Sequence, residues 1–358
     1  MDQDKMPENV IISKNGSIGQ IILNRPKALN ALSLDMIRDI RFAFDRWEND
    51  NSVKAIYISA NGGRAFCAGG DIKHFYRVGM DYRRGDIGFD VAMLFFKEEY
   101  DLNEVIFSYS KPVISHMHGI TMGGGYGIAG NAKYRIVAND TVFAMPETKI
   151  GFFPDIGSMY HLTRVSGNLG LFLAMTGTSI RSGDMLVMGL AEYACEIEEQ
   201  DALIKALNEE FARDEDLHGI VQGVLSSKCG VSSDNRLYSE EAMAQLSAIF
   251  GAENVGKIIQ NLNSNNEFSA LSEEMNRNSP FSISFAKAYY DFCIGKTFQD
   301  VIKSDFNVCS VFAKGSEFYE GIRAAVIDKD KAPVWLHKAV QDVQKGEISR
   351  YLAENCDQ

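Results

Sequence analysis

The chain has 358 residues and an ordinary globular composition, with 46% hydrophobic and 23% charged residues. At roughly 150 residues per domain, this length predicts one large domain or two. The net charge of -12 argues against a general nucleic-acid binder, which would normally present a basic face, although a local basic rim for an anionic ligand is still compatible with it.

The cysteines and the N-terminal segment indicate a reducing compartment. None of the six cysteines forms a C-x-x-C pair, and their irregular spacing argues against a disulfide framework or a zinc site. The first residues, MDQDKMPENV, lack the basic and apolar regions of a signal peptide, and no run of about 18 apolar residues predicts a membrane span. We therefore expect a cytoplasmic protein, or one of the mitochondrial matrix if the chain is a processed eukaryotic form.

The N-terminal part predicts two strands, a helix and a third strand. Residues 10–13 and 18–23 are β-rich runs joined by the turn KNGS, which predicts a hairpin. Ser33 is a good N-cap for a helix that follows, and residues 53–60 read as a buried strand. One face of the helix should carry Leu34, Ile37, Ile40, Phe44 and Trp47.

Two glycine-dense turns each connect a strand to the start of a helix. In GGRAFCAGGDIKHFY, residues 62–76, a short apolar run reaches Gly70, and Asp71 follows as an N-cap. Gly70 has no side chain to block an oxygen atom that approaches its N–H group. In HGITMGGGYGIAG, residues 118–130, Gly124 or a neighbour can offer a second N–H donor. Two backbone donors at one oxygen form an oxyanion hole. Taken singly, each turn could equally be an ordinary strand–turn–helix connection with no functional role.

The second turn also contains the pattern G-x-G-x-x-G, at Gly125, Gly127 and Gly130. A dinucleotide-binding unit would require an acid about 20 residues later, at the end of a second parallel strand. The nearest downstream acids are Asp140 and Glu147, and their strands are short and paired. We therefore place the dinucleotide interpretation far behind the oxyanion hole, and we expect close helix packing through small residues as well.

Two acids follow in an otherwise apolar segment, AMPETKIGFFPDIG, residues 144–157. Pro146 precedes Glu147 and Pro154 precedes Asp155, so both carboxyls should lie in rigidly held turns. Near an oxyanion hole in a dry pocket, such a carboxyl can act as a base, an acid or a nucleophile. Helix capping is the alternative, and it accounts for one acid more readily than for two.

The two histidines His116 and His118 alternate on one predicted strand. A zinc site needs at least a third ligand, and no nearby Cys, His or Asp pattern supplies it, so we expect no metal and a core or supporting role for both rings. The chain has no G-x-S-x-G nucleophile elbow and no Walker loop.

The order of the predicted elements defines the fold class. Up to about residue 200 the strands come in pairs before each helix, which predicts an α/β protein with a ββα spiral core and not a doubly wound sheet. After that point the periodicity is mostly helical. We therefore expect a spiral domain with the active site at residues 1–200 and a helical C-terminal region at residues 201–358.

Together these segments resemble the crotonase superfamily, also called the enoyl-CoA hydratase/isomerase family. AFCAGGDI resembles its first oxyanion segment, HGITMGGGYG its second, and LNRPKALNALS its N-terminal turn on the coenzyme A side. Within that superfamily the chain is more similar to the 3-hydroxyisobutyryl-CoA hydrolases, through FFKEEYDLN, HGITMGGG, FAMPETKIGFFPDIGSMY and FYEGIRAAVIDKDKAPVW. The resemblance spans nearly the whole chain, and the last two segments are its most specific part.

One departure from the hydratases of this family bears on the reaction. Hydratases generally carry an acid two residues past the last glycine of the second turn, where this chain has Gly127. A hydratase uses two glutamates to add water across a C=C bond, so hydration should be poor here. Asp155 instead occupies a place where hydratases usually have a small residue. The resemblance thus implies hydrolysis of a short-chain 3-hydroxyacyl-CoA thioester, such as 3-hydroxyisobutyryl-CoA in valine breakdown.

The resemblance also implies a role for each site residue. The N–H groups of Gly70 and Gly124 would hold the thioester oxygen. Glu147 would attack the carbonyl carbon or activate water as a base. Asp155 would contact the 3-hydroxyl of the substrate or protonate the departing sulfur, and Glu99 would lie near the substrate. Coenzyme A arrives as part of the substrate, so no metal or redox cofactor is required.

Several alternatives and partners follow from the same reading. An enoyl-CoA hydratase or isomerase is the first alternative, and a non-catalytic acyl-CoA-binding protein is the second, although a mere binder needs no carboxyl at the carbonyl. We expect an acyl-CoA substrate, no nucleic acid and no membrane partner, and we leave a homo-oligomer open. By position alone, Arg25, Lys27 and Lys73 are candidates for binding the phosphates of coenzyme A.

Overall fold

The computed structural model describes residues 9–213 and 216–353. Its contacts divide the chain into two compact units, each built from separate stretches. The sheet unit comprises Met1–Gly70, Asp101–Phe143 and Ile180–Leu237, and the helical unit comprises Asp71–Tyr100, Ala144–Ser179 and Tyr238–Gln358. Compact units need not be independent domains, so the domain boundary expected at residue 200 stays a prediction.

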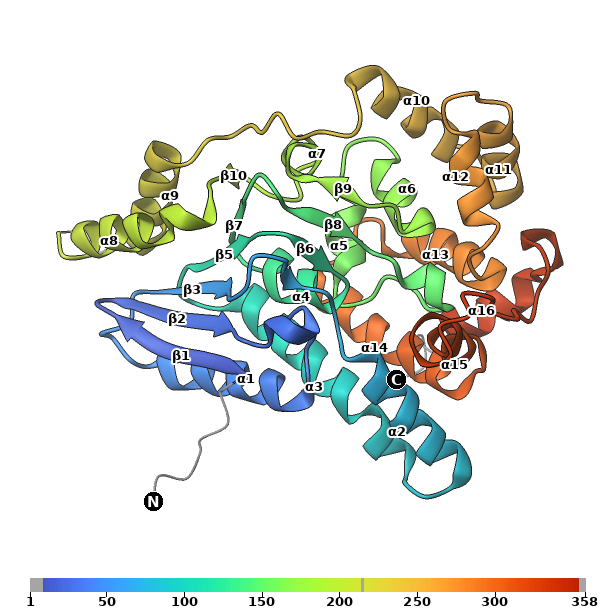
Figure 1. Cartoon of the computed structure of the whole chain (residues 1–358), viewed down its shortest axis with the longest axis horizontal. Helices are drawn as coiled ribbons and strands as arrows, with labels where there is room; N and C mark the ends of the chain where they lie inside the picture. The colour runs from blue at the N-terminus through green and yellow to red at the C-terminus, as the bar shows by residue number, and fades with distance from the viewer. Residues whose placement is uncertain (1–8, 214–215, 354–358) are drawn as a thin grey trace. The chain divides into compact units, whose positions relative to one another are not determined.

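The sheet unit is organised around two sheets (Figure 1). The larger sheet has six strands in the order β1-β2-β3-β5-β7-β10, and the smaller has four in the order β4-β6-β8-β9. The strands are β1 (Val10–Asn15), β2 (Ile18–Leu23), β3 (Ala55–Ala60), β4 (Ala65–Cys67), β5 (Val113–Met117), β6 (Ile120–Met122), β7 (Tyr134–Val137), β8 (Val142–Ala144), β9 (Ile180–Arg181) and β10 (Tyr193–Ala194). This mixture of strands and helices confirms the predicted α/β class.

Strand pairing in the larger sheet begins with the predicted hairpin. Strands β1 and β2 pair antiparallel with Val10 opposite Leu23, and the pairs from β2 to β10 across the sheet are parallel. Parallel strands need crossover connections, and the helix at Leu34–Glu48 supplies the one between β2 and β3. All six residues of β3 are buried, as its continuous apolar run predicts.

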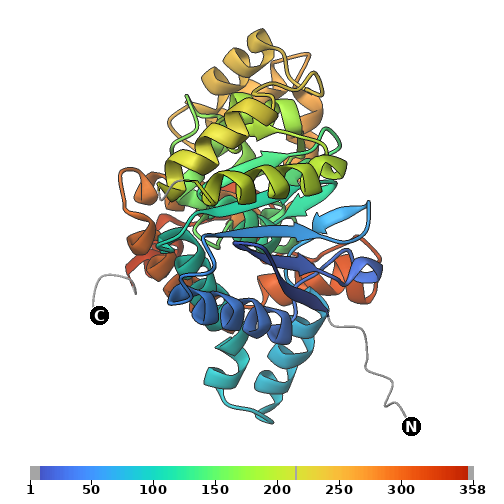
Figure 2. The same cartoon turned by 90° about the vertical axis from the view of Figure 1, so that its left-hand side faces the viewer.

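Helix α1 (Leu34–Glu48) follows the hairpin and packs on β1 and β2; it is the blue helix beside these strands in Figure 2. Ser33 is its N-cap, and the Ser33 hydroxyl accepts a hydrogen bond from the Met36 N–H group at 3.3 Å. The predicted apolar face is confirmed with one correction. Leu34 is only half-buried, and Met36, which was not predicted on this face, is buried.

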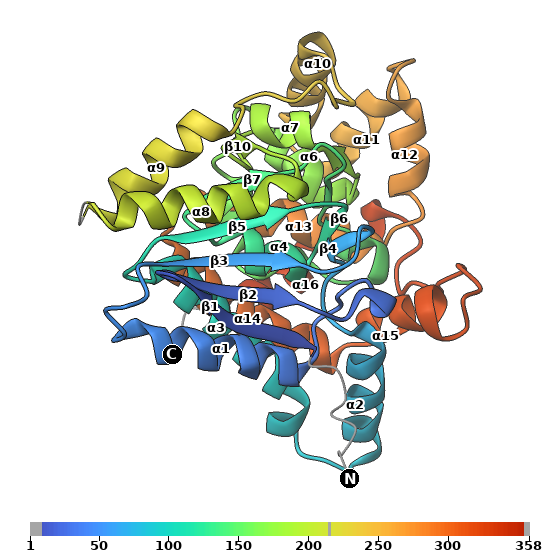
Figure 3. The same ribbon diagram turned by 60° about the vertical axis from the view of Figure 1, so that its left-hand side comes forward.

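Two helices after residue 200 also belong to the sheet unit. Helix α8 (Gln200–Phe211) and helix α9 (Leu217–Lys228) lie side by side against the larger sheet (Figure 3). Their apolar faces join side chains of the strands β2, β3, β5, β7 and β10 in one core cluster. The cluster includes Ile18, Tyr57, Ile114, Ile136, Leu203, Leu207, Val221 and Leu225. The remaining helices of the unit are α4 (Gly124–Gly130) and α7 (Ser182–Val187), with 3-10 turns η1 (Pro26–Ala28) and η3 (Ile197–Glu199).

The helical unit confirms the helix-rich C-terminal region. Helix α3 (Phe89–Ser108) begins in this unit, and its residues from Asp101 onward belong to the sheet unit. The other elements are α2 (Ile72–Arg84), η2 (Glu147–Ile150), α5 (Ser158–Leu162), α6 (Leu169–Thr176), α10 (Glu240–Phe250), α11 (Val255–Asn263), α12 (Ser269–Met275), α13 (Pro280–Cys293), α14 (Phe298–Lys314), α15 (Glu317–Ile322), η4 (Arg323–Ile327), η5 (Val340–Asp342) and α16 (Lys345–Ala353).

Aromatic side chains form the centre of the helical unit. The ring of Phe152 stacks on Phe318 at a centroid distance of 4.4 Å, and Phe153 contacts Tyr289 edge to face at 5.4 Å. Phe153 also stacks on Phe312. Such pairs favour defined geometry as well as burial. The Phe152–Phe153 pair therefore fixes the chain just before Asp155.

Among the described residues, no helix combines the length and apolar character needed to cross a membrane.

Candidate active site

The two glycine turns meet inside the sheet unit. Strands β4 and β6 pair in parallel, so the turns that follow them lie at the same edge of the smaller sheet. Gly69 has a φ of +104°, a conformation that favours glycine. A Cβ atom at Gly69 would lie 3.3 Å from the Met122 carbonyl oxygen and 3.6 Å from the Gly124 nitrogen. The positive φ and this close approach together make a side chain at Gly69 unfavourable.

The backbone donors predicted for the oxyanion hole remain available. In the part of the chain that the structure describes, neither the Gly70 N–H nor the Gly124 N–H donates to another protein group. Gly124 is the first residue of α4, where N–H groups have no partner within the helix. Leu32 fixes the first turn by donating its N–H to the Gly69 carbonyl at 2.8 Å. Both predicted donors are thus held in place and can bind an oxygen atom.

The acid Glu147 lies in the helical unit at the start of the 3-10 turn η2. Pro146 is the N-cap residue, so Glu147 begins the turn and does not cap it with its side chain. The next residue, Thr148, holds the turn: its hydroxyl donates to the Met175 carbonyl at 3.2 Å, and its carbonyl accepts the Ser279 N–H at 3.2 Å. Hydrogen bonds to two other segments of the helical unit therefore hold the main chain next to Glu147.

The acid Asp155 lies in the loop after the Phe152–Phe153 pair. Helix α5 begins after Gly157, and the capping alternative for Asp155 is wrong because the N-cap residue is Gly157. The Asp155 carboxyl instead accepts a hydrogen bond from the Tyr100 hydroxyl at 2.5 Å, with both groups buried. Ile156 and Gly157 have φ angles of +58° and +75°, so the chain turns sharply directly after the acid.

Three carboxyls gather within the helical unit, and burial dominates their electrostatics. Glu99, Glu147 and Asp155 are 3%, 6% and 6% exposed. Burial raises the pKa of Asp155 to about 7, while the Tyr100 hydrogen bond opposes that rise. Burial also raises the pKa values of Glu99 and Glu147 well above the usual range, and the charge on Asp155 raises both further. The influence of Asp155 on both glutamates indicates that the predicted acids lie near one another.

Two oxygen atoms of this cluster lack a partner. Among the described residues, neither Glu147 Oε2 nor Glu99 Oε1 has a hydrogen-bond partner, although both are buried. A buried carboxyl oxygen without a partner costs free energy, on the order of 1–3 kcal/mol or more. Groups of this kind concentrate at functional sites, where a ligand or water completes the bonding. The cluster can therefore bind a polar group, accept a proton from it and return one.

Sequence reasoning missed two buried residues of this region, Tyr100 and Asp305. Tyr100 follows Glu99 directly in α3, and its hydroxyl bonds Asp155. Asp305 lies in α14, and its carboxyl accepts hydrogen bonds from the Gly157 N–H and the Tyr289 hydroxyl, each at 2.6 Å. A signal existed for Asp305, because it is an acid at helical spacing among the apolar residues Val301 and Val308. No comparable pattern marked Tyr100.

The histidines lie in the core, as predicted. His116 is fully buried; its Nδ1 lies 2.7 Å from the Tyr57 hydroxyl and its Nε2 lies 2.9 Å from the Cys195 carbonyl oxygen. Burial lowers the His116 pKa to about 4, so the ring is neutral at physiological pH. His118 Nε2 lies 2.7 Å from the Gly62 carbonyl oxygen. Within the described ranges, no group of three or more metal-ligating side chains occurs.

Two further sequence expectations concern the second glycine turn. Asp140, an acid weighed for dinucleotide binding, accepts a hydrogen bond from the Gly119 N–H at 3.1 Å, which is a structural use. Gly127 is buried within α4, and its carbonyl accepts the Asn131 amide at 2.9 Å. Of the basic candidates for coenzyme A, Arg25 donates to the Ala31 carbonyl at 3.0 Å. Lys27 is exposed in η1 and Lys73 is exposed in α2.

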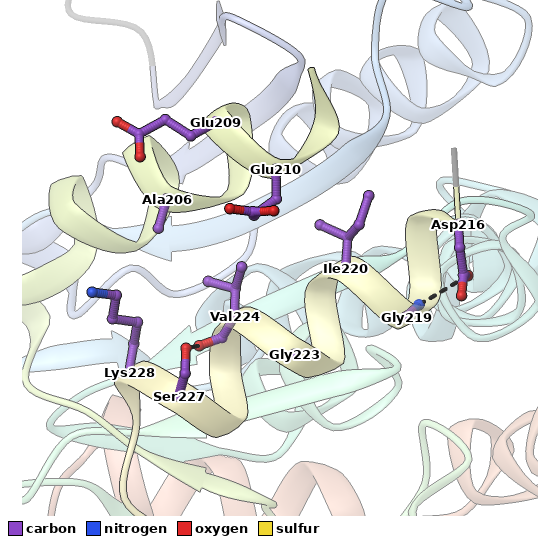
Figure 4. A pocket seen from close by; sticks show the side chains of 10 residues that line it. All are labelled: Ala206, Glu209, Glu210, Asp216, Gly219, Ile220, Gly223, Val224, Ser227 and Lys228. Atoms are coloured by element: carbon purple, nitrogen blue, oxygen red, sulfur yellow. Dashed lines mark hydrogen bonds between the residues drawn. The ribbon is translucent and has the colours of Figure 1, made fainter. Parts of the chain in front are cut away.

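A separate groove lies between α8 and α9 (Figure 4). It has a volume of about 500 Å³, and its walls carry Glu209 and Glu210 from α8 and Lys228 from α9. The polar contacts in it are those that helices make for themselves: Asp216 caps α9 by accepting the Gly219 N–H at 3.0 Å. None of the predicted site residues lines this groove, so it gives no support to the predicted chemistry.

The sequence model of the enoyl-CoA hydratase/isomerase family matches residues 18–352, and the chain belongs to this family. Among curated relatives, the chain is 35% identical over 347 residues to the mitochondrial 3-hydroxyisobutyryl-CoA hydrolase of Homo sapiens, covering 96% of this chain and 88% of the relative. It is 37% identical over 351 residues to the mitochondrial 3-hydroxyisobutyryl-CoA hydrolase of Mus musculus, with the same coverage of 96% and 88%.

Solved structures show the same fold over almost the whole chain. A carnitinyl-CoA dehydratase from Mycobacterium thermoresistibile has a TM-score of 0.84 at 29% identity and covers 96% of both chains. An enoyl-CoA hydratase from Rhodobacter sphaeroides 2.4.1 has a TM-score of 0.83 at 30% identity and covers 97% of both chains. The two sequence relatives are named as hydrolases, and the two solved structures are named as a dehydratase and a hydratase. Because one fold hosts several reactions, the site residues must decide between them.

Proposed function

We propose that the protein hydrolyses a short-chain 3-hydroxyacyl-CoA thioester, with 3-hydroxyisobutyryl-CoA as the preferred substrate and 3-hydroxyisobutyrate and coenzyme A as products. The observation that carries this proposal is the buried carboxyl cluster of Glu99, Glu147 and Asp155, in which Glu147 Oε2 has no partner among the described residues. The named relatives support the choice of substrate. The enzyme would act in the reducing conditions of the cytoplasm or mitochondrial matrix.

The first step is attack on the thioester carbonyl carbon. The N–H groups of Gly70 and Gly124 bind the carbonyl oxygen, which gains negative charge as the tetrahedral intermediate forms. Each such donor contributes roughly 3–4 kcal/mol in other enzymes. Glu147 supplies the attacking group in one of two ways. Its carboxylate bonds to the carbon and gives a mixed anhydride, which water then cleaves, or it takes a proton from a water molecule that attacks directly.

The second step is departure of the coenzyme A sulfur. When the C–S bond breaks, its electron pair leaves with the sulfur, and the thiolate takes a proton. Asp155 suits this task because its pKa of about 7 leaves part of the population protonated at neutral pH. Its other proposed role is a hydrogen bond to the 3-hydroxyl of the substrate. That bond would give selectivity, because an analogue without the hydroxyl leaves a buried polar group unpaired.

The proposed reaction needs no metal or redox cofactor, because the N–H donors and carboxyls supply both charge stabilisation and proton transfer.

One residue, Gly127, argues against the alternative function as a hydratase. A hydratase of this family would carry a second acid where this chain has Gly127, which is buried in α4 and has no side chain to offer. The binding-protein alternative leaves the costly burial of three carboxyls without a purpose.

The test uses the purified full-length chain with 3-hydroxyisobutyryl-CoA and, separately, crotonyl-CoA. Free thiol is followed with a thiol reagent, and loss of the enoyl group by ultraviolet absorbance. We expect thiol release from the hydroxyacyl substrate and a drop of about 10³-fold or more in Glu147→Gln. Enoyl loss without thiol release would support the hydratase. No reaction with either substrate would support the binding protein.

A labelling experiment separates the two roles of Glu147. In a single turnover in H₂¹⁸O, direct attack by water places the label in the product acid and leaves the enzyme unlabelled. In the anhydride route, water can cleave the anhydride at the Glu147 carbonyl, which places the label in that carboxyl. Mass spectrometry of the peptide that contains Glu147 therefore identifies the anhydride if the label appears there.

A further inference from the structure

The carboxyl of Asp305 contacts the loop that carries Asp155. Asp305 is fully buried on α14, and its Oδ2 accepts the Gly157 N–H at 2.6 Å. Its Oδ1 accepts the Tyr289 hydroxyl, also at 2.6 Å, from α13. Gly157 lies only two residues after Asp155. One buried carboxyl thus ties the loop to two helices of the same unit.

The loop at this point has an unfavourable backbone conformation. Ile156 has a φ of +58°, which is rare for a β-branched residue and costs on the order of 1–3 kcal/mol. Gly157 continues the left-handed turn with a φ of +75°, and a Cβ atom there would lie 2.3 Å from the Phe298 ring. A conformation of this kind persists only where surrounding contacts hold it.

An acid at this place in α14 is itself costly. Asp305 lies on the apolar face with Val301 and Val308, and burial raises its pKa well above the usual range. A residue that only completed the core would be apolar, because replacing buried ionisable groups by apolar ones is often stabilising. The position therefore requires an acceptor, and the Gly157 N–H is the donor that the loop presents to it.

We propose that Asp305 is a positioning residue for Asp155: its carboxyl holds the left-handed turn at Ile156 and Gly157 and so fixes the direction in which the Asp155 side chain points. The Asp155 carboxyl then has two independent supports. Tyr100 holds its oxygen, and Asp305 holds the main chain that follows it. Without the second support, Ile156 would relax to a negative φ and rotate the peptide next to Asp155. This inference rests on the proposed thioester hydrolysis.

The first test compares variants of the full-length protein on 3-hydroxyisobutyryl-CoA. Asp305→Ala should lower kcat about 10- to 100-fold with KM within about threefold, because misplaced catalytic groups lose rate. Asp305→Asn should stay within about threefold of the wild type, since its amide oxygen can accept from Gly157 and its NH₂ group can donate to the Tyr289 oxygen. If Asp305→Ala fails to fold, Asp305→Val fills the space without an acceptor and takes its place.

A matched control separates positioning from loss of packing. Val308→Ala removes a fully buried side chain from the same helix and leaves the Gly157 hydrogen bond intact. It should lower Tm and leave kcat unchanged. The double variant Asp155→Asn/Asp305→Ala should have the same kcat as Asp155→Asn, because both changes act through one residue. An undiminished effect of Asp305→Ala in the Asp155→Asn background would overturn the proposal.

A readout that needs no activity keeps the inference distinct from the proposed function. The protonated carboxyl of Asp155 is identified by infrared spectroscopy as the band that Asp155→Asn removes. Its titration midpoint should fall from about 7 by at least one pH unit in Asp305→Ala, as the released loop admits water, and stay in place in Val308→Ala. An unmoved midpoint would overturn the positioning role. A wild type without thiol release but with the shifted midpoint would refute the proposed function alone.

Discussion

The Tyr100 hydroxyl donates a hydrogen bond to Asp155 Oδ2 at 2.5 Å. The bond favours the charged form of Asp155 and opposes the effect of burial, which is the larger of the two, so the pKa settles at about 7. Glu99 precedes Tyr100 on α3, and burial raises its pKa, to which the Asp155 charge adds. Two consecutive residues of α3, Glu99 and Tyr100, are thus coupled to the protonation state of Asp155.

Removing the Tyr100 hydroxyl should shift the pH dependence of the reaction upward. In Tyr100→Phe the Asp155 carboxylate loses a donor, so its pKa rises above 7 and the protonated form persists to higher pH. The limb of the pH–rate profile that Asp155→Asn abolishes should therefore move to higher pH by about one unit. Steady-state thiol release between pH 5 and 10 measures this shift.

The matched control for that change is Tyr319→Phe. Tyr319 is another buried tyrosine of the helical unit, and its hydroxyl donates to the Ala313 carbonyl at 2.8 Å and not to an acid. Its profile should follow the wild type. A limb that stays in place in Tyr100→Phe, or moves equally in both variants, would contradict the proposed control of Asp155 by Tyr100.

The raised pKa of Asp155 predicts a pH-dependent cost in stability. The ordinary value for the unfolded chain is 3.8, and the folded value is about 7. Between these values the folded protein binds more protons, so its free energy of unfolding falls as pH rises from about 4 to 7 and then levels off. The full loss is on the order of 4 kcal/mol. At low pH the favourable contribution is fully present.

Asp155→Asn should remove that dependence. An asparagine still accepts the Tyr100 hydrogen bond but cannot ionise, so the variant should unfold at a higher temperature than the wild type at pH 8 and show little advantage at pH 4.5. Thermal unfolding across this range measures both. Asp234→Asn, the same change at an exposed residue, is the control. An equal Tm difference at both pH values would refute the assigned pKa.

Local patterns predicted the fold elements closely, and they singled out the glycine turns and buried acids that the structure describes. The KNGS turn, the Ser33 cap and the apolar run of β3 each depend on neighbours in the sequence, and each appears as expected. The glycine turns could be paired because they follow strands that become neighbours in the smaller sheet. The family resemblance of FFKEEYDLN and FAMPETKIGFFPDIGSMY predicted the site acids Glu99, Glu147 and Asp155.

Long-range contacts explain what the sequence did not reveal. Nothing near Tyr100 in the sequence indicates a bond to a residue 55 positions later. Asp305 meets Gly157 across 148 positions, and the packing of α5 against α13 and α14 brings them together. Capping was a reasonable use for Asp155 by local rules, but the φ angle of +58° at Ile156 directs the chain differently, and residue propensities do not predict such a conformation.

Because the buried His116 ring is neutral, the protein should lose stability as the pH falls. The His116 pKa falls from 6.5 to about 4 on burial, so the unfolded chain binds more protons between these values and the free energy of unfolding decreases as pH drops through this range. The loss is on the order of 3 kcal/mol. His116→Gln should flatten this limb in urea unfolding between pH 4 and 7. His74→Gln on α2, a half-buried site, should follow the wild type.

The proposed oxyanion role of Gly124 can be tested by removing one N–H group. Proline is well tolerated at the first position of a helix, which Gly124 occupies in α4, and it lacks the donor. Gly124→Pro should therefore keep the fold and lower kcat for thiol release by about 10²- to 10³-fold, the usual cost of losing one such donor. Gly124→Ala keeps the N–H and should retain far more activity. Equal losses in the two variants, with circular dichroism unchanged in both, would show that side-chain space and not the N–H group matters at this position.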